Sequence, residues 1–502
     1  MRDDSRMSEP SLDLLVITDL HYARAAGEPP EAPGRRTFLG PLLLRKALLR
    51  LKHQGVAPGA IVLLGDLVDD GMANDAEEHW AAIAAEAHEA KMPVLAVPGN
   101  HDVDPARCAR VFGCEPGLHE IGGYGFMVFH DRVAAGDVTT RPDEVLALPR
   151  KAALAKPGLP LVALQHNPLH PPIEAEYPYM LTNATEIMSA YKEAGVLLSL
   201  SGHYHPGQPG HAVDGTTYYT APAACEAPFR FAWISLRGRH VAIREEALQM
   251  SAPGLADVHC HTEYAYCGTT VRAEDNIRVS RAMGIERLYL TEHTFQLYFE
   301  KKEAWSWRWQ TDEAMVERAW TSGRGRMRDF RRFAEAVRQE AVSVGNEVDL
   351  RADGSLLLAE EDRQGWDIIV GAVHAIPAYR KGQTSQAETE KLFLRQTEGL
   401  LRQPIHVLAH PFRFFLREGL VRPVHLYGPV AAMLARSGVA AEVNFHTNQP
   451  DPRFLAECLA RGVKLACGTD SHDLAEVGEF WPHLNVLRQA GVGDGSLKLF
   501  GG

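Results

Sequence analysis

The chain has few cysteines and no long hydrophobic run. Its seven cysteines are odd in number and none stands in a CxxC pair, so the sequence predicts neither a disulfide framework nor a thiolate zinc knuckle. A reducing, cytoplasmic compartment is the expectation that follows. Nowhere do the roughly 18 consecutive apolar residues of a membrane helix occur, and the apolar run near the start is too short for a signal peptide. The sequence therefore predicts neither export nor membrane contact.

Basic residues are outnumbered by acidic ones. Lys and Arg number 52 against 64 Asp and Glu, which gives a net charge of −12 and argues against a general electrostatic grip on nucleic acid. An anionic substrate must then be held locally, by metal ions or a few arginines. Histidine is plentiful, at 23 residues, and imidazole is a common ligand of divalent metals. At about 100 to 200 residues per domain, the 502 residues predict two to four domains.

Strands and helices alternate in the first half of the chain. Short apolar runs predict buried strands at 12–18, 60–66, 93–100, 159–166 and 196–203. Apolar residues at three- and four-residue spacing predict helices at 41–54 and 74–91. Two β-rich runs, 216–222 and 229–246, complete a sheet. This order is typical of an α/β fold whose ligands bind at the carboxyl edge of the strands.

The pattern restarts at Asp257, after a segment (249–256) that carries no motif. We therefore predict two domains, 1–250 and 251–502. In the second, helices are expected at 272–283, 325–341 and 386–402, and strands at 286–293, 346–350, 367–374, 405–411, 440–445 and 463–472. No repeat links the halves, so two different folds are expected.

Strand ends of the first half carry acid, imidazole and amide side chains, which are Asp19, His21, Asp66, Asn100, His101, His166, His203 and His205. Alternate residues of an extended segment point the same way, so DxH and HxH each present two ligands together. A carboxylate such as Asp66 can bridge two cations, as in two-metal hydrolytic sites. Asp69 and Asp70 are interpreted as turn residues and His170 as a loop residue.

These motifs, DxH, GDxxD, GNHD, a single His and GHxH over 12–247, resemble those of the calcineurin-like metallophosphoesterases. The resemblance implies a β-sandwich flanked by helices. It also implies one cation held by Asp19, His21, Asp66 and His205, and another held by Asp66, Asn100, His166 and His203. Asp66 and His101 would be catalytic, His101 as an acid or phosphate contact. The segment HNPLHPPI resembles the HHPP segment of the branch acting on cyclic nucleotides and glycerophosphodiesters.

Polar side chains also stand at the ends of the predicted strands in the second half. They are His259, His261, His293, Glu347, His374, His410, Asp470 and His472. Nitrogen and oxygen ligands of this kind suit Zn, Mn or Fe. The motifs resemble those of the PHP family, named for polymerase and histidinol phosphatase, over about 254–490. The resemblance implies a distorted (β/α)7 barrel with up to three cations at its carboxyl rim.

By that resemblance the ligands divide into three groups: His259, His261, Glu347 and Asp470; Glu347, His374 and His410; and His293 with His472. Glu347 and Asp470 would be catalytic. One position departs from the family, because many members have another His where this chain has Cys267, followed by the matching Gly268. Two interpretations stay open, a thiolate ligand or a buried, inert thiol.

An insertion at 301–333 is rich in tryptophan and arginine. It is either a lid that stacks on a substrate ring while Arg308 binds phosphate, or a packed element whose helix buries Phe330, Phe333, Ala334 and Val337. Arg413, in HPFRF, is a second candidate phosphate contact.

Two hydrolytic centres in one chain favour a bifunctional metal-dependent phosphoesterase, with two Mn, Fe or Zn ions in the first half and two or three in the second. The first half would open a small-molecule phosphodiester and the second would remove the resulting phosphomonoester. A nuclease or repair phosphoesterase is an alternative that the charge argues against. Another alternative makes one half regulatory or structural. The organic part of the substrate, the native metals and the oligomeric state, including a homo-oligomer, stay open.

Overall fold

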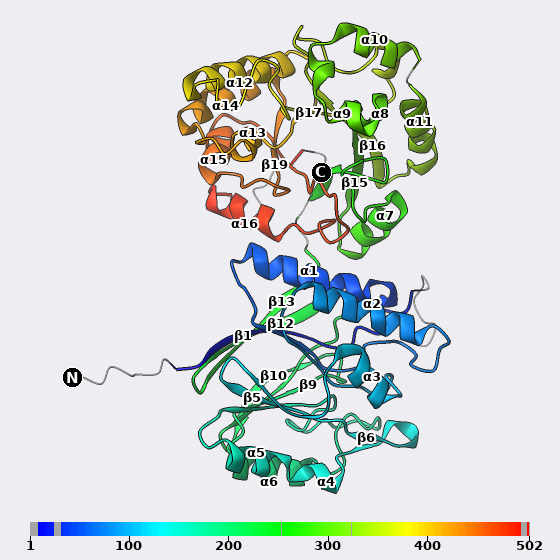
Figure 1. Cartoon of the computed structure of the whole chain (residues 1–502), viewed down its shortest axis with the longest axis vertical. Coiled ribbons are helices and arrows are strands. Elements are labelled where there is room, and N and C mark those ends of the chain that lie inside the picture. Colours follow the sequence, from blue (N-terminus) through cyan, green and yellow to red (C-terminus); the bar gives the residue numbers. More distant parts are fainter. Residues whose placement is uncertain are drawn as a thin grey trace, which may run out of the picture. The chain divides into compact units, whose positions relative to one another are not determined.

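Figure 1 shows the computed structural model, which describes residues 9–24, 32–250, 252, 254–322, 324–492 and 499–500. The chain divides into two compact units, Met1–Gln249 and Met250–Gly502. Residues 251 and 253 of the segment predicted as a boundary lie outside the described residues. None of the described helices is long and apolar enough to cross a membrane.

The first unit is a sandwich of two sheets. One sheet has the order β13 (His240–Ala247), β12 (Arg230–Arg237), β1 (Ser11–Ile17), β2 (Ala60–Leu63) and β3 (Val94–Ala96). The other has the order β10 (Gln208–Val213), β11 (Thr216–Thr220), β9 (Leu198–Ser201), β8 (Leu161–Leu164), β5 (Tyr124–Val128) and β4 (Gly117–Ile121). A separate pair joins β6 (Arg132–Val133) and β7 (Thr139–Thr140). Since β1 runs parallel to β2, their carboxyl ends meet at one edge.

Helices cover the outer faces of both sheets (Figure 1). On the first sheet lie α1 (Gly40–His53) and α2 (Ala76–Glu89), with α3 (Pro105–Phe112) beside β3. On the second lie α4 (Asp143–Leu146), α5 (Leu148–Ala155) and α6 (Ala184–Ala194). In α1 the buried side chains of Leu43, Leu44, Ala47 and Leu51 form the apolar stripe that its spacing predicts.

The second unit is a nearly closed barrel of seven parallel strands. In order they are β14 (Ala256–Cys260), β15 (Arg287–His293), β16 (Val342–Asp349), β17 (Ile368–Ala372), β18 (Val407–Leu408), β19 (Ala440–Val443) and β20 (Leu465–Cys467). A parallel bridge between Cys260 and Ser471 joins the first strand to the segment after the last. The (β/α)7 barrel expected for this half is therefore confirmed.

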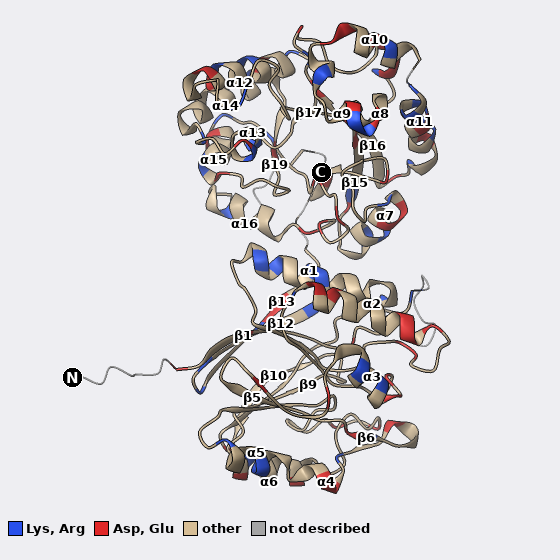
Figure 2. Cartoon of the chain, in the orientation of Figure 1, with Lys and Arg blue, Asp and Glu red and all other residues tan. Residues whose placement is uncertain are grey.

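The helices of the second unit surround this barrel (Figure 1). They are α7 (Ala273–Ala282), α8 (Thr294–Tyr298), α9 (Lys301–Ala304), α10 (Glu313–Thr321), α11 (Gly325–Val337), α12 (Gln386–Leu401), α13 (Arg413–Arg417), α14 (Tyr427–Ser437), α15 (Pro452–Ala460) and α16 (Trp481–Gln489). Acidic and basic residues occur together on α7, α10 and α12 (Figure 2).

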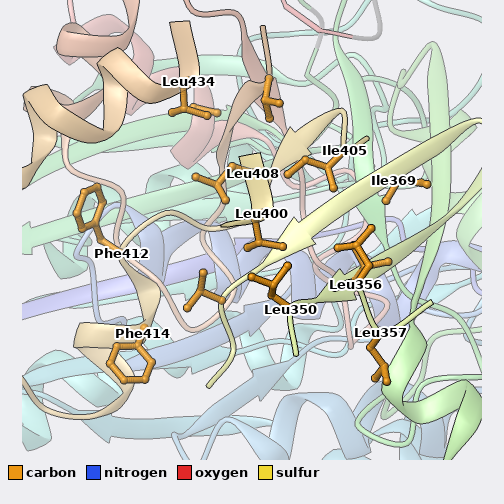
Figure 3. Close-up of a cluster of buried hydrophobic side chains, with 14 of the residues drawn as sticks. Leu350, Leu356, Leu357, Ile369, Leu400, Ile405, Leu408, Phe412, Phe414 and Leu434 are labelled. Carbon is orange, nitrogen blue, oxygen red and sulfur yellow. The ribbon is translucent and has the colours of Figure 1, made fainter. Parts of the chain in front are cut away.

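Both faces of the barrel strands are buried. In β17, Ile368, Val370 and Ala372 join one apolar cluster, whereas Ile369 joins a second. The second cluster also holds Leu400, and Figure 3 shows it between strands and helices. Strands buried on both faces have continuous apolar sequences, and for this reason they could be predicted from the sequence.

Several elements differ from the sequence expectation, among them the strand expected at 405–411, which is only Val407–Leu408, and the helices α6, α14 and α16, which were not predicted. The helix expected to reach residue 341 ends at Val337, because Arg338 is extended and a turn between Gln339 and Val342 starts β16. The hairpin of β4 and β5 was not predicted. Its signal is the pair Gly122–Gly123, both at positive φ, in a two-residue turn.

Candidate metal centres

The predicted ligands of the first unit meet at the carboxyl edge of its strands. They follow β1, β2, β3, β8 and β9 in the positions that the motifs assign. Asp19, His21, Asp66 and His203 have left-handed backbones, with φ of 52°, 41°, 48° and 65°. Such conformations cost about 1–3 kcal/mol each and cluster at functional sites. They direct side chains into positions that a regular strand could not reach.

Asp66 lies between two groups of imidazoles. Its Oδ2 is 3.6 Å from Nε2 of His21 and 3.3 Å from Nε2 of His166. His205 completes one side, with Nε2 3.6 Å from Oδ1 of Asp19. The ligand atoms of Asp19, His21 and His205 form one compact group, and those of Asp66, His166 and His203 form another. One carboxylate therefore touches both groups.

Several inward-facing atoms of this cluster are buried and make no hydrogen bond. They are Oδ1 of Asp19, Oδ1 of Asn100 and the Nε2 atoms of His21, His166 and His203. The opposite ring nitrogen of His166 is engaged, since its Nδ1 lies 2.6 Å from the Leu64 carbonyl oxygen, and Nδ1 of the neighbouring His205 lies 2.6 Å from Oε1 of Glu226. An imidazole oriented through one nitrogen with the other left free is typical of a metal ligand. The donor set fits a pair of divalent cations.

The electrostatics of the cluster also fit a bound cation. Burial lowers the pKa of an imidazole, but the Asp66 carboxylate outweighs burial at His166 and raises the pKa of His166 to about 10. Burial and the neighbouring His166 lower the pKa of His203 to about 4. The carboxylates thus attract one positive charge, which is what a cation supplies.

Close approach of the backbone requires glycine at two positions. A Cβ at Gly99 would lie 2.2 Å from Oδ1 of Asp66, and a Cβ at Gly202 would lie 2.0 Å from Oγ1 of Thr18. Both contacts are shorter than any that a side chain can make, so the GNHD and GHxH motifs need their glycines for packing.

Some neighbours of these ligands lie outside the predicted set. Asp69 lies in a bend after β2, its Oδ1 is 3.4 Å from Nδ1 of His21, and its carbonyl oxygen is 2.5 Å from Nδ1 of His101. Glu226, which contacts His205, belongs to no motif. His170 packs its ring against His211 and Tyr218.

In the second unit the predicted ligands surround Glu347. Its Oε1 lies 2.9 Å from Nε2 of His410 and 3.2 Å from Nε2 of His374. Its Oε2 lies 2.5 Å from Nδ1 of His293 and 3.5 Å from Nε2 of His259. His261 contacts Asp470, with 3.0 Å between Nε2 and Oδ1. Glu347 is fully buried, and its imidazole neighbours, His374 first, outweigh burial and hold its pKa well below the usual range.

Carboxylates outside the predicted set orient these imidazoles. Nδ1 of His259 lies 2.9 Å from Glu442, and Nδ1 of His374 lies 3.0 Å from Asp349. Nε2 of His259 and Nε2 of His374 are buried and make no hydrogen bond. Asp349 stands two residues after Glu347 in a strand, so same-face spacing could have found it. The donor set again fits divalent cations.

Arg413 is buried among the ligands. Its guanidinium donates to Oδ2 of Asp470 at 2.6 Å and lies 2.7 Å from Nε2 of His410. A pocket of about 490 Å³ opens beside it, and Arg417, Trp305, His293 and His472 also line this pocket. Arg417 makes no ion pair with any residue that the structure describes.

The insertion is mostly packed structure. Trp309, Phe330 and Ala334 are buried, and Phe333 and Val337 pack against the same cluster. Trp305, 38% exposed, is the part of the insertion that reaches the pocket wall. Arg308 is not among the lining residues, and its exposed guanidinium pairs with Asp312 at 2.9 Å. The structure does not bring Arg308 to the ligand cluster.

Both halves match known families. The calcineurin-like phosphoesterase model matches residues 12–207, and the PHP domain model matches residues 257–446. No curated protein matches the chain. These matches confirm both resemblances, and both families use divalent metals.

Solved structures also resemble single halves of the chain. A dimetal phosphatase from Danio rerio is 18% identical, covering 48% of this chain and 99% of its own, with a TM-score of 0.37. A purple acid phosphatase from yellow lupin is 13% identical, and the match covers 48% of this chain and 52% of the phosphatase, with a TM-score of 0.34. A Listeria monocytogenes protein assigned as a histidinol phosphatase is 13% identical, and the match covers 45% of this chain and 99% of the Listeria protein, with a TM-score of 0.35. From its two family matches, the chain is a metal-dependent phosphoester hydrolase in which a calcineurin-like phosphoesterase domain is followed by a PHP domain.

Proposed function

We propose that the first unit hydrolyses a small-molecule phosphodiester and that the second hydrolyses the phosphomonoester so formed. The observation that carries this proposal is the pair of central carboxylates, Asp66 and Glu347, each surrounded by imidazoles in its own unit. We propose two cations in the first unit and two or three in the second, drawn from Mn, Fe and Zn. When bound, such cations polarise phosphoryl oxygens and activate water.

In the first unit, His101 is the candidate proton donor to the leaving oxygen. Its Nδ1 donates to the Asp69 carbonyl oxygen, so Nε2 is the nitrogen left for substrate. Its ring lies 4.5 Å from that of His21, beside the ligand group. The rings of Tyr177 and Tyr179, each 5.6 Å from that of His203, would contact the second substituent of a diester.

In the second unit, the pocket favours one phosphate and a modest organic group. Arg417 offers a guanidinium without an ionic partner among the described residues, and Arg413 holds Asp470 at the base. Trp305 and Phe295, whose rings lie 5.6 Å apart, form an apolar wall for the organic group. These features support a phosphomonoester substrate.

The test is a screen of phosphodiesters with intact, metal-loaded protein and two variants. Wild type should release inorganic phosphate from the right diester. Glu347→Gln should stop at the monoester, because the bridging carboxylate of the second unit is lost. Asp66→Asn should leave the diester intact yet hydrolyse added monoester.

The order of products decides between the alternatives. If Glu347→Gln releases phosphate from the diester at the wild-type rate, the units do not act in series. If one unit never hydrolyses any ester, a regulatory or structural role for that unit replaces the proposal. Cleavage of oligonucleotides in preference to small diesters would favour a nuclease.

The proposal includes a cytoplasmic location. All seven cysteines are free, which fits a reducing cytoplasm. We propose a soluble small-molecule substrate as the partner.

A further inference from the structure

Cys267 faces an imidazole of the proposed second metal centre. Its Sγ lies 3.1 Å from Nε2 of His472 and 3.2 Å from Nε2 of Gln296. Nδ1 of His472 donates to the Asp470 carbonyl oxygen at 2.7 Å, so Nε2 presents its lone pair to the sulfur. In a tetrahedral zinc site with Zn–S near 2.3 Å and Zn–N near 2.0 Å, sulfur and nitrogen lie about 3.6 Å apart. The observed separation needs only a small opening to admit a cation.

Two more imidazoles lie close to that of His472. The ligand atoms of His261, His293 and His472 lie within 4.8 Å of one another. The rings of His293 and His472 lie 4.2 and 4.5 Å from that of His261. His261 is fully buried, and its Nδ1 makes no hydrogen bond but lies 3.5 Å from Oε2 of Glu292. Oε2 of Glu292 is also buried without a hydrogen bond, and an imidazole nitrogen and a carboxylate oxygen buried in this way indicate a place for a cation.

The surroundings of Cys267 differ from those of an inert thiol. Gln296 is fully buried, and its Oε1 accepts a hydrogen bond from the backbone of Tyr266, which turns its Nε2 toward the sulfur. Cys458, by contrast, packs inside an apolar cluster. Cys267 instead lines the pocket that holds Trp305 and Arg417. An amide donor held against sulfur is the kind of outer contact that orients a metal ligand.

We propose that Cys267 binds a cation as a thiolate, together with His261, His293 and His472. The thiol proton leaves to solvent as the metal–sulfur bond forms, so no oxidant or reductant is needed. Sulfur is a soft ligand, and this position therefore prefers Zn²⁺ or Co²⁺ to Mn²⁺. The inference rests on the metal centre proposed for the second unit and adds a sulfur ligand and a metal preference to it.

Cobalt tests the two proposals separately in the intact, metal-stripped protein. Bound Co²⁺ gives visible d–d absorption with any ligands, whereas a cobalt–thiolate bond adds a near-ultraviolet charge-transfer band. Wild type should show both signals on titration. Cys267→Ser should lose the charge-transfer band and keep the d–d bands. Cys267→His should keep cobalt bound without the charge-transfer band.

Cys225 is the matched control, because its thiol also lies close to candidate ligands, here His205 and Glu226 of the first unit. Cys225→Ser should retain the charge-transfer band, and circular dichroism should show every variant folded. Zn²⁺ affinity of the cysteine-dependent position should fall roughly 10- to 100-fold in Cys267→Ser, with Mn²⁺ affinity unchanged.

Three results would overturn the inference. A charge-transfer band that survives Cys267→Ser, or one that disappears in Cys225→Ser, assigns the sulfur elsewhere. Visible bands without any charge-transfer band in wild type reject the thiolate ligand and leave the metal centre standing. If neither signal develops, the metal centre itself is wrong.

Discussion

Nδ1 of His205 lies 2.6 Å from Oε1 of Glu226, a residue that no motif contains. The carboxylate fixes the ring so that Nε2 faces Asp19. Glu226→Gln keeps the shape but loses the charge, and we expect metal affinity of the first unit to fall about 10- to 100-fold. Calorimetric metal titration of the intact chain measures this. Glu89→Gln, at the exposed end of α2, is the control, and equal losses in both variants would contradict a specific role.

Glycine substitutions should separate the two activities. Gly99→Ala drives a Cβ against Asp66, so diester hydrolysis should fall at least about tenfold while monoester hydrolysis stays normal. Gly468→Ala should do the reverse, because its Cβ would lie 2.1 Å from Oε1 of Glu442, which orients His259. Gly325→Ala, with open space around it, should change neither. Loss of both activities in Gly99→Ala would mean that the units are coupled.

Arg417 and Arg308 offer a matched pair for substrate binding. Arg417→Ala should lower kcat/KM for monoesters roughly 10- to 100-fold, since a hydrogen bond to a charged group contributes about 1.5–3 kcal/mol. Arg308→Ala should have no effect, because that side chain is exposed and pairs with Asp312. Steady-state kinetics on both variants decide the matter. A larger loss in Arg308→Ala would restore the lid interpretation of the insertion.

The two units should fold separately. Each has its own sheets and its own internal packing, so fragments 1–250 and 251–502 should each unfold cooperatively. Metal should raise the stability of each fragment by about 2.7 kcal/mol at a free concentration near 100 Kd, and a chelator should remove this gain. Thermal denaturation with and without chelator measures both effects. Molten fragments, under conditions where the whole chain is stable, would show that each unit needs the other.

The sequence revealed the ligands because each one ends an apolar strand in a compact motif. Asp19 with His21 and Asp470 with His472 stand at alternate positions, so spacing alone paired them. Glu226 and Glu442 were not predicted because they stand outside the motifs, 21 residues from His205 and 183 residues from His259, and only folding brings each pair together. Arg308 was wrongly predicted to bind phosphate. Its guanidinium pairs with Asp312, four residues later, and the arginine content of the insertion did not show this pairing.

The bridge between Cys260 and Ser471 has a consequence for the order of synthesis. His259 and His261 leave the ribosome early in the second half, but Asp470, their carboxylate partner, is made some two hundred residues later. Until β20 emerges, these histidines have no partner from the closing strand. The first unit is complete once β13 is made, so a growing chain can acquire metal there while its barrel is still open. We therefore expect the two centres to mature in sequence, that of the first unit before that of the second.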